Sequence, residues 1–292
     1  MLLLDKVLFT VALAGEVDTA MVQGMAGAGV ANPYDGNAIR RSPASMQLVV
    51  DYTGQSDFYG SLAEGPLVGG LVSVKDTRTS DFGAGLQTRR QWSNIPPRDH
   101  ELPGWKQPGT EFSDKRWEQD WRLGVGYGFG KQALLTPDGS QEVRRFAVGA
   151  GAVYTRTTSE LSGSLNDWEF NAGLAARPLA PLTVAASAHG LGPWGHEPLW
   201  YEAGAFVDYT RWQFAADGIY RPTEDTPMGW RAGAGVQIES LLLRTGAAYD
   251  RGQWLVAGGL GVASEGVRAD YGVQFDLASG HVTHSVGFFG QF

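Results

Sequence analysis

The sequence predicts an all-β protein: a transmembrane antiparallel β-barrel of about 14 strands, with a small N-terminal hatch segment in the lumen. Three observations predict it. Apolar and polar residues alternate along most of the chain after residue 45, the alternating segments are 9–11 residues or longer, and aromatic residues gather near their ends. The 292 residues include 41 Gly, 10 Trp, 10 Tyr and 13 Phe. So much Gly is typical of disorder, but disordered chains contain few aromatic residues.

The composition also excludes several classes of function. With no Cys, the chain has no disulfide, Cys-containing zinc site, iron–sulfur centre, thiol nucleophile or lipidated Cys anchor. A net charge of −8 and a pI near 5.1 argue against a nucleic-acid partner.

The first residues resemble a secretory signal. A short apolar run follows Lys6 and ends in Ala12-Leu13-Ala14, a small-x-small pattern that signal peptidase cleaves. Residues 1–14 are therefore expected to be a signal peptide; the alternative is a first buried strand or helical turn. No later run of 18 apolar residues predicts a transmembrane helix, so a membrane would have to be crossed by strands.

The segment 267–277 shows the strand pattern most clearly. Its apolar face alternates with Arg268, Asp270, Gly272, Gln274 and Asp276 on the other face. The same alternation recurs in residues 120–129, 167–177, 211–221 and 230–239. A soluble β-sandwich or a lipocalin-like barrel would alternate too. Segments of this length suit a tilted crossing of a bilayer, however, and soluble strands are shorter.

Fourteen such segments cover residues 46–292, which we expect to be the barrel. They are 46–55, 67–76, 81–92, 119–129, 143–156, 165–176, 180–190, 199–209, 211–221, 229–239, 240–249, 253–263, 265–277 and 282–292. An even number leaves both ends on the periplasmic side, with the polar loop 93–118 outside. Residues 130–142 would be an unexpectedly long periplasmic connection, and 56–66 could be a loop or an extra strand pairing.

The polar residues of these strands are expected to face the lumen. There they would neutralise one another and hydrogen-bond the hatch; the alternative is a polar pore for ions or sugars. The lumen-facing polar residues so predicted are Arg122, Arg145, Glu169, Asp217, Arg231, Arg268 and Asp270.

The chain ends in a pattern that resembles the signal read by the barrel-assembly machinery, which would make that machinery a partner. Phe292 is the terminal aromatic residue and Gly287 stands five residues before it. Gly290 departs from the pattern, which has a second hydrophobic residue there.

Residues 21–46 carry a resemblance to a known family. The stretch Gly27-Ala28-Gly29-Val30-Ala31 is followed by a spacer with Asp35 and then by Ser42-Pro43-Ala44-Ser45. It resembles the N-terminal hatch of the long-chain fatty acid transporter family (FadL/TodX-like outer-membrane proteins), with Ser-Pro-Ala-Ser in place of Asn-Pro-Ala-Gly. We therefore expect residues 15–45 to form a hatch, with Gly27, Gly29, Asp35, Ser42, Pro43 and Ala44 at the ligand passage. The alternative is a flexible exported tail.

The resemblance implies passive uptake of hydrophobic compounds, such as fatty acids, across the bacterial outer membrane. Membrane lipid and a hydrophobic small molecule would then be the binding partners. The alternative is a non-transporting barrel that serves as a scaffold subunit in a secretion, motility or surface machine, with other envelope proteins as partners.

An enzyme is not expected. The five His residues show no metal-ligand spacing, and His284 and Ser285 point to opposite faces of a strand. His196 with Glu197, beside Trp194, is the only candidate catalytic pair, and it is more simply a loop histidine in water. No catalytic residue, metal or cofactor is therefore predicted.

Overall fold

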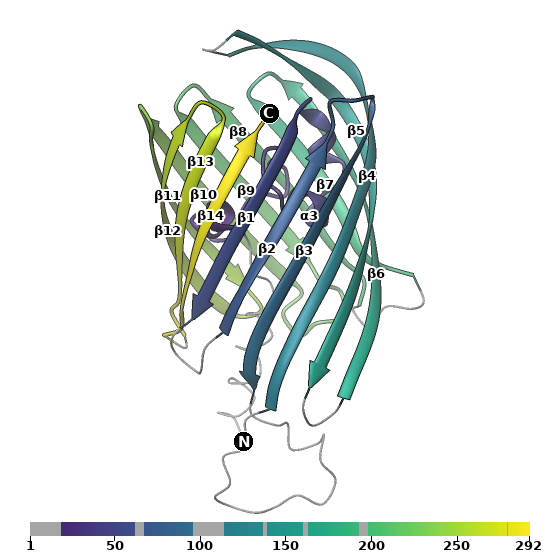
Figure 1. Cartoon of the computed structure of the whole chain (residues 1–292), viewed down its shortest axis with the longest axis vertical. Coiled ribbons are helices and arrows are strands. Elements are labelled where there is room, and N and C mark those ends of the chain that lie inside the picture. Colours follow the sequence, from purple (N-terminus) through teal and green to yellow (C-terminus); the bar gives the residue numbers. More distant parts are fainter. Residues whose placement is uncertain are drawn as a thin grey trace, which may run out of the picture.

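The computed structural model describes residues 19–61, 67–95, 114–136, 139–159, 163–192, 198–278 and 280–292. These residues form a closed antiparallel barrel of fourteen strands around short helical turns, which confirms the predicted fold class (Figure 1). The helices are α2 (Ala20–Gln23), α3 (Ala38–Arg41) and the 3-10 helix η1 (Ser45–Leu48). None of the helices in the described part of the chain is long and apolar enough to cross a membrane.

The strands follow one another around the barrel. They are β1 (Tyr52–Ser61), β2 (Leu67–Asp76), β3 (Phe82–Ile95), β4 (Asp114–Thr136), β5 (Gly139–Ser159), β6 (Gly163–Leu179), β7 (Leu182–Leu191), β8 (Trp200–Tyr209), β9 (Trp212–Tyr220), β10 (Met228–Ile238), β11 (Leu241–Asp250), β12 (Gln253–Ser264), β13 (Val267–Asp276) and β14 (Val282–Gln291). Each pairs with its neighbours in sequence, and β1 pairs with β14 to close the barrel. The closure ends where the Phe292 amide donates to the Tyr52 carbonyl at 2.8 Å.

The two ends of the barrel differ. We call the end where β1 begins and β14 stops the closing end; it is uppermost in Figure 1. Its hairpins turn over short connections such as 210–211, 239–240 and 265–266, whereas 192–199 and 221–227 join strands at the opposite end.

Several predicted boundaries were wrong. The loop predicted at 93–118 is strand up to Ile95 and again from Asp114, and two other stretches also differ. Residues 46–49 were predicted to belong to the first strand, but Met46 and Leu48 are buried in η1 and β1 begins only at Tyr52. The first part of the ambiguous stretch 56–66 is strand, because β1 continues as far as Ser61. Residues 130–142 were predicted to be a connection, but β4 and β5 continue as a paired hairpin from Lys131↔Arg144 to Thr136↔Gly139. Gly130, with φ of +74°, disturbs the alternation there without ending the ladder.

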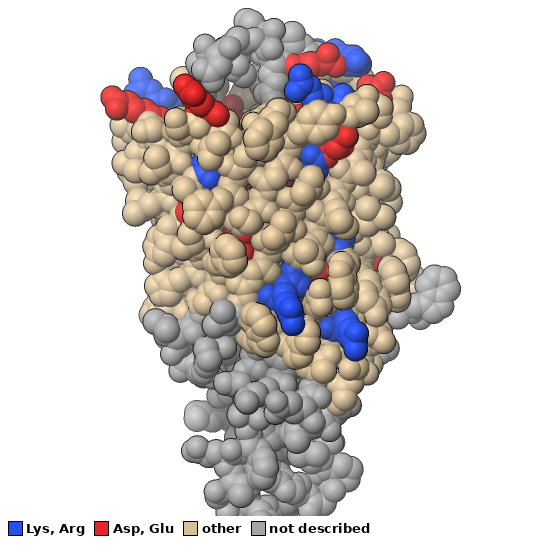
Figure 2. Space-filling view, viewed as in Figure 1, with Lys and Arg blue, Asp and Glu red and all other residues tan. Residues whose placement is uncertain are grey.

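The outward face of the barrel is apolar. Aromatic residues that the sequence placed near strand ends are exposed, among them Trp121, Phe129, Trp168, Trp212 and Trp254. In Figure 2 uncharged residues cover most of the described face, and charged side chains gather mainly toward its two ends. A continuous apolar belt of this size is stable only against hydrocarbon, so the barrel spans a membrane.

The barrel interior is filled by residues 19–51, which we call the plug (Figure 1). Its apolar residues and inward small residues of the wall form the main buried cluster: Met25, Ala28, Val30, Ala31, Ala44 and Leu48 from the plug, and Ala147, Ala175, Ala185, Phe206 and Ala215 from β5–β9. The core of the protein therefore lies between the plug and one side of the wall.

Candidate functional site

The plug contacts the wall around most of its circumference. α2 lies against β12, β13, β14 and β1; α3 lies against β3, β4 and β5; η1 lies against β4–β7. Thr19 begins α2 by accepting the Val22 amide on its hydroxyl at 3.4 Å, and Gly27, with φ of +81°, turns the chain after it. The plug meets the closing end where Val49 bridges Val143.

Glycine makes this close contact possible. A Cβ on Gly246 would lie 2.4 Å from the carbonyl carbon of Met25, and one on Gly149 would lie 2.5 Å from the amide nitrogen of Ala44. Further inward glycines in similar contact with the plug are Gly85, Gly126, Gly128, Gly233 and Gly272. The plug backbone therefore lies directly on the wall backbone, and larger residues at these positions would displace it.

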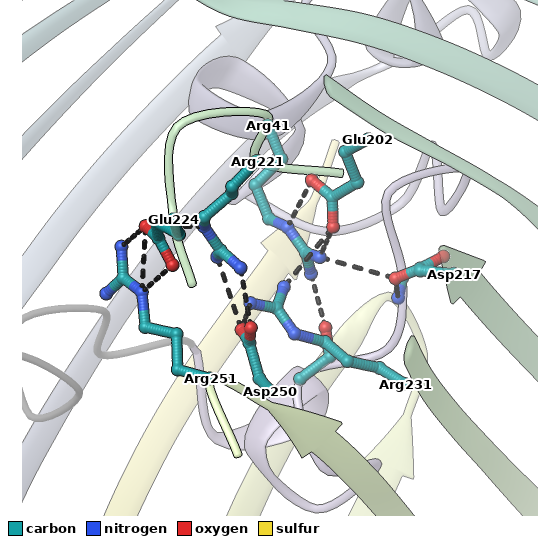
Figure 3. Close-up of polar contacts among 10 residues, drawn as sticks. Arg41, Glu202, Asp217, Arg221, Glu224, Arg231, Asp250 and Arg251 are labelled. Carbon is teal, nitrogen blue, oxygen red and sulfur yellow. Dashed lines mark hydrogen bonds and ion pairs between the residues drawn. The ribbon is translucent and has the colours of Figure 1, made fainter. Parts of the chain in front are cut away.

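A buried ion pair fastens the plug to the wall (Figure 3). The Arg41 guanidinium donates to the carboxylate of Glu202 and to the carbonyl oxygen of Gly27, and its Nη2 lies 3.3 Å from Asp217 Oδ2. The Asp217 carboxylate also accepts the amides of Gly29 at 2.6 Å and Val30 at 3.1 Å. All three charged side chains are at most 5% exposed.

Further ion pairs connect Glu202 to the end of the barrel opposite the closing end. Arg231 joins Glu202 at 3.2 Å to Asp250 at 3.3 Å, and Arg221 lies 2.5 Å from Asp250. Glu224, in the connection between β9 and β10, pairs with Arg251 at 2.8 Å and lies 3.6 Å from Arg221. We call this series, Arg41–Glu202–Arg231–Asp250–Arg221–Glu224, the ion-pair chain; Figure 3 shows that it links the plug to that connection.

A second polar contact holds the start of the plug. Asp35 is buried and accepts the Thr19 hydroxyl at 2.6 Å and the Asn37 amide at 2.8 Å. Burial raises the pKa of Asp35 above its ordinary value, since desolvation disfavours the charged carboxylate. On the wall, Asp57 accepts the Ala20 amide at 2.7 Å.

The wall on the β1–β4 side meets the plug with polar groups. The Lys75 ammonium donates to the Pro33 carbonyl at 2.9 Å and lies 3.1 Å from the Asp51 carboxylate. Arg122 is buried, donates to Gln87 at 2.7 Å and pairs with Asp120 at 2.7 Å. The β1–β4 side thus adds hydrogen bonds and ion pairs to the contacts that hold the plug.

The remaining predicted hatch residues lie at the centre of the plug. Ser42 ends α3, and its hydroxyl accepts the Ser45 amide at 3.3 Å. The Pro43 carbonyl carbon and the Ala44 backbone approach Gly149 of β5. Together with Gly27, Gly29 and Asp35, the predicted residues all lie in one buried segment, but only Gly27, Gly29 and Asp35 make polar contacts beyond their own turn.

The predicted lumen-facing residues divide into several groups. Asp217 and Arg231 belong to the ion-pair chain. Arg268 and Arg244 both pair with Asp270, at 2.5 Å and 2.6 Å. Glu169 lies 3.7 Å from His189, whose ring stacks on Trp200 at 3.9 Å.

Arg145 departs from the prediction. Its side chain is exposed, and the neighbouring Arg144 is buried and donates to the carbonyls of Gln47 and Thr77, both at 3.1 Å. Pairing is interrupted between Phe129↔Phe146 and Lys131↔Arg144, opposite the positive φ of Gly130, which shifts the alternation.

The residues of the predicted assembly signal lie where β14 pairs with β1 to close the barrel. Gly287 pairs with Asp57 of β1 and Asp270 of β13, and its Cβ would collide with the Asp57 carboxylate at 2.1 Å. Phe292 is 77% exposed and closes the barrel through its backbone.

Arg41, Arg221 and Asp250 of the ion-pair chain were not among the predicted site residues. Two consecutive arginines, at positions 40 and 41, stand in a segment of small residues, and this could have indicated a partner in the wall. His196, Glu197 and most of the loop 93–118 lie outside the described residues. Within them, no group of three or more acidic or His side chains is arranged to hold a metal ion.

The lipid-facing side of β6–β9 is hollowed. A groove of about 600 Å³ runs across this face; we call it the outer groove. It is lined by Ala172, Leu174, Ala186, Ala188, Tyr201, Ala203, Gly218, Tyr220 and Met228, among others. It covers the β6–β7 pair, whose register shifts twice, between Phe170 and Ala172 and between Ala176 and Leu179. Pro178, in the second interval, has no amide to donate to the ladder.

The fold is similar to that of solved barrels. A Pseudomonas aeruginosa FadL homologue matches with a TM-score of 0.63 at 11% identity, over 95% of this chain and 98% of its own. The CymD monoaromatic hydrocarbon channel matches with a TM-score of 0.62 at 12% identity, over 94% and 97% of the two chains. The Pseudomonas putida toluene transporter TodX matches with a TM-score of 0.61 at 12% identity, over 94% and 98%. No family model and no curated protein matches the sequence.

Proposed function

We propose that this protein is a bacterial outer-membrane channel for the passive uptake of small hydrophobic molecules. The observation that carries the proposal is the combination of a plug packed against the wall inside a 14-strand barrel with an apolar groove on the lipid-facing side of the same wall. The closing end would face the periplasm and the opposite end the outside, since short turns are typical of the periplasmic side.

The similar solved structures support this choice of substrate class. Two of them are described as a monoaromatic hydrocarbon channel and a toluene transporter. Their match extends over nearly the whole of both chains, so the plug and the barrel are both part of the likeness. Fatty acids and monoaromatic compounds are accordingly the substrates to test.

The arrangement favours a lateral exit over an axial one. The plug lies on the wall backbone at glycines from β3 round to β13, so a hydrophobic molecule leaving along the axis would have to displace a buried, ion-paired segment. The outer groove lies instead over the irregular β6–β7 pair, where the lining is rich in Ala and Gly but also includes Leu174, Tyr201 and Glu202. A path through this part of the wall delivers an apolar molecule into hydrocarbon and avoids water.

The test is an uptake assay with labelled toluene and oleate, in cells that lack their own channel for them. Outer-membrane fractionation and heat-modifiable migration on gels first establish that a folded barrel is present. We expect uptake above the empty-vector rate and a strong reduction in Ala186→Trp/Ala203→Trp, which fills the outer groove. Ala247→Trp, also outward-facing but on β11, is the matched control and should transport normally.

The tight plug also favours a second candidate, a scaffold subunit that transports nothing. In that case the folded barrel would reach the outer membrane but neither probe would enter above the empty-vector rate. Envelope proteins cross-linked to it in cells would then be its partners.

A further inference from the structure

The outward face of β3–β6 carries three successive rungs of cross-strand neighbours near the end opposite the closing end. The innermost contains Leu86↔Leu123, and the next is Thr88↔Trp121↔Tyr154↔Trp168. The outermost is Arg90↔Gln119↔Arg156↔Asn166, which we call the cationic rung. Over these three rungs the surface therefore changes from aliphatic to aromatic to cationic, and the pair Trp92↔Trp117 follows beyond the cationic rung.

Arg90 lies over two indole rings. Its guanidinium carbon lies 5.2 Å from the ring centroid of Trp92 and 4.2 Å from that of Trp117. The side chain is exposed, unlike that of Arg89, which points inward and pairs with Glu118 and Asp120. The two ring contacts orient the guanidinium, and because the side chain is exposed its N–H donors remain open.

Arg156 is also exposed and lies two strands away from Arg90 on the same rung, a separation of roughly 10 Å from the usual strand spacing. Neither arginine has a carboxylate partner among the described residues. At the same end of the barrel, Arg221 and Arg251 are both paired with acids. Figure 2 shows basic side chains protruding from the lower part of the described face.

The other two members of the rung add hydrogen-bonding amides. The Asn166 Oδ1 accepts the Tyr154 hydroxyl at 2.9 Å, which leaves the Asn166 amide N–H groups to donate outward. Gln119 lies between the two arginines. The rung therefore presents two guanidinium groups and side-chain amides at the level where hydrocarbon gives way to headgroups.

We propose that the cationic rung binds the phosphorylated sugar headgroup of lipid A in the outer leaflet. Guanidinium edges match phosphate oxygens in pairs, and amides suit the hydroxyls and amides of a sugar. Two arginines on one rung fit a headgroup with two phosphates better than a glycerophospholipid with one. The inference rests on the proposed placement in the outer membrane, with this end outward, and is independent of whether the barrel transports anything.

The test is binding of lipid A to the purified full-length protein in detergent, measured by native mass spectrometry. The double variant Arg90→Gln/Arg156→Gln should bind lipid A at least about tenfold more weakly, since each arginine supplies charge-assisted hydrogen bonds. Arg211→Gln, an exposed arginine at the closing end, is the matched control and should bind like the wild type. Heat-modifiable migration verifies that each variant is folded.

Three results would overturn the proposal: undiminished lipid A binding by the double variant, an equal loss in Arg211→Gln, or binding of phosphatidylglycerol as tight as that of lipid A. A lipid A lacking both phosphates should bind no better to the wild type than to the double variant. Failure of the outer-membrane placement would be seen separately, as absence of the wild type from the outer-membrane fraction.

Discussion

Removing the Arg41 side chain should weaken the attachment of the plug to the wall without unfolding the barrel. In Arg41→Ala, the Glu202 and Asp217 carboxylates lose their shared guanidinium while remaining buried. Arg231 still lies 3.2 Å from Glu202, and the Gly29 and Val30 amides still donate to Asp217, so the loss is partial.

The size of the expected loss in stability follows from the burial of Arg41, Glu202 and Asp217. Breaking a buried ion pair by removing one partner costs about 3–5 kcal/mol, because the other charge is left uncompensated. The two remaining contacts place the expected loss near the lower figure, about 3 kcal/mol. Because 1.4 kcal/mol is tenfold, the equilibrium constant for local opening of the plug should rise by roughly 100-fold.

Amide hydrogen exchange measures this opening directly. The Gly29 and Val30 amides, which donate to Asp217, should exchange roughly 100-fold faster in Arg41→Ala, while amides in the β11–β12 ladder keep their protection. Arg251→Gln is the control, since Arg251 is 23% exposed at the outer end of the network and its loss should leave these amides unchanged. Unchanged exchange in Arg41→Ala would refute the idea that the ion pair fastens the plug.

Two further predictions concern the plug. Gly246→Ala should cost about 1–3 kcal/mol of stability, because the new Cβ would press on Met25. We expect a lower thermal unfolding temperature and faster hydrogen exchange of the plug amides. Gly258→Ala is the control and should leave both unchanged, since a Cβ there meets nothing closer than 4.0 Å. Burial raises the pKa of Asp35 above 3.8, its value in the released plug. The protonated carboxyl therefore stabilises the docked plug fully when the pH is below 3.8, and this stabilisation is lost as the pH rises through the raised pKa. Exchange of the Asn37 amide, corrected for its intrinsic pH dependence, should therefore accelerate with rising pH over that window in the wild type but not in Asp35→Asn, and equal profiles would contradict this.

The barrel could be predicted from the sequence because its evidence is local. A residue in a strand faces lipid or lumen according to its parity, so alternation along residues 267–277 already separates Val273 and Phe275 from Asp270 and Gln274. The strand count follows from repeating this test along the chain. The alternation test failed where a residue is apolar for a reason other than facing lipid. Met46 and Leu48 are apolar because they are buried within the barrel as part of the plug.

The ion-pair chain could not be predicted in the same way. Arg41 and Glu202 are 161 positions apart, and their meeting depends on the depth at which the plug stops inside the barrel. Alternation shows that Glu202, Asp217 and Arg231 face inward, but every inward charge has several partners of opposite sign within reach across the lumen. The pairing is set by the shape of the plug backbone, which alternation does not describe.

The excess of glycine and the ion-pair chain are consequences of one constraint. The plug backbone comes this close to the wall only where the wall lacks side chains, which explains why Gly246 faces Met25 and Gly149 faces Ala44. At these glycines the wall contributes no side chain, so the apolar packing of the plug comes mainly from the cluster against β5–β9. Charged groups therefore supply the remaining attachment, and charges can be displaced by competing charges or by protonation, whereas a large apolar contact cannot.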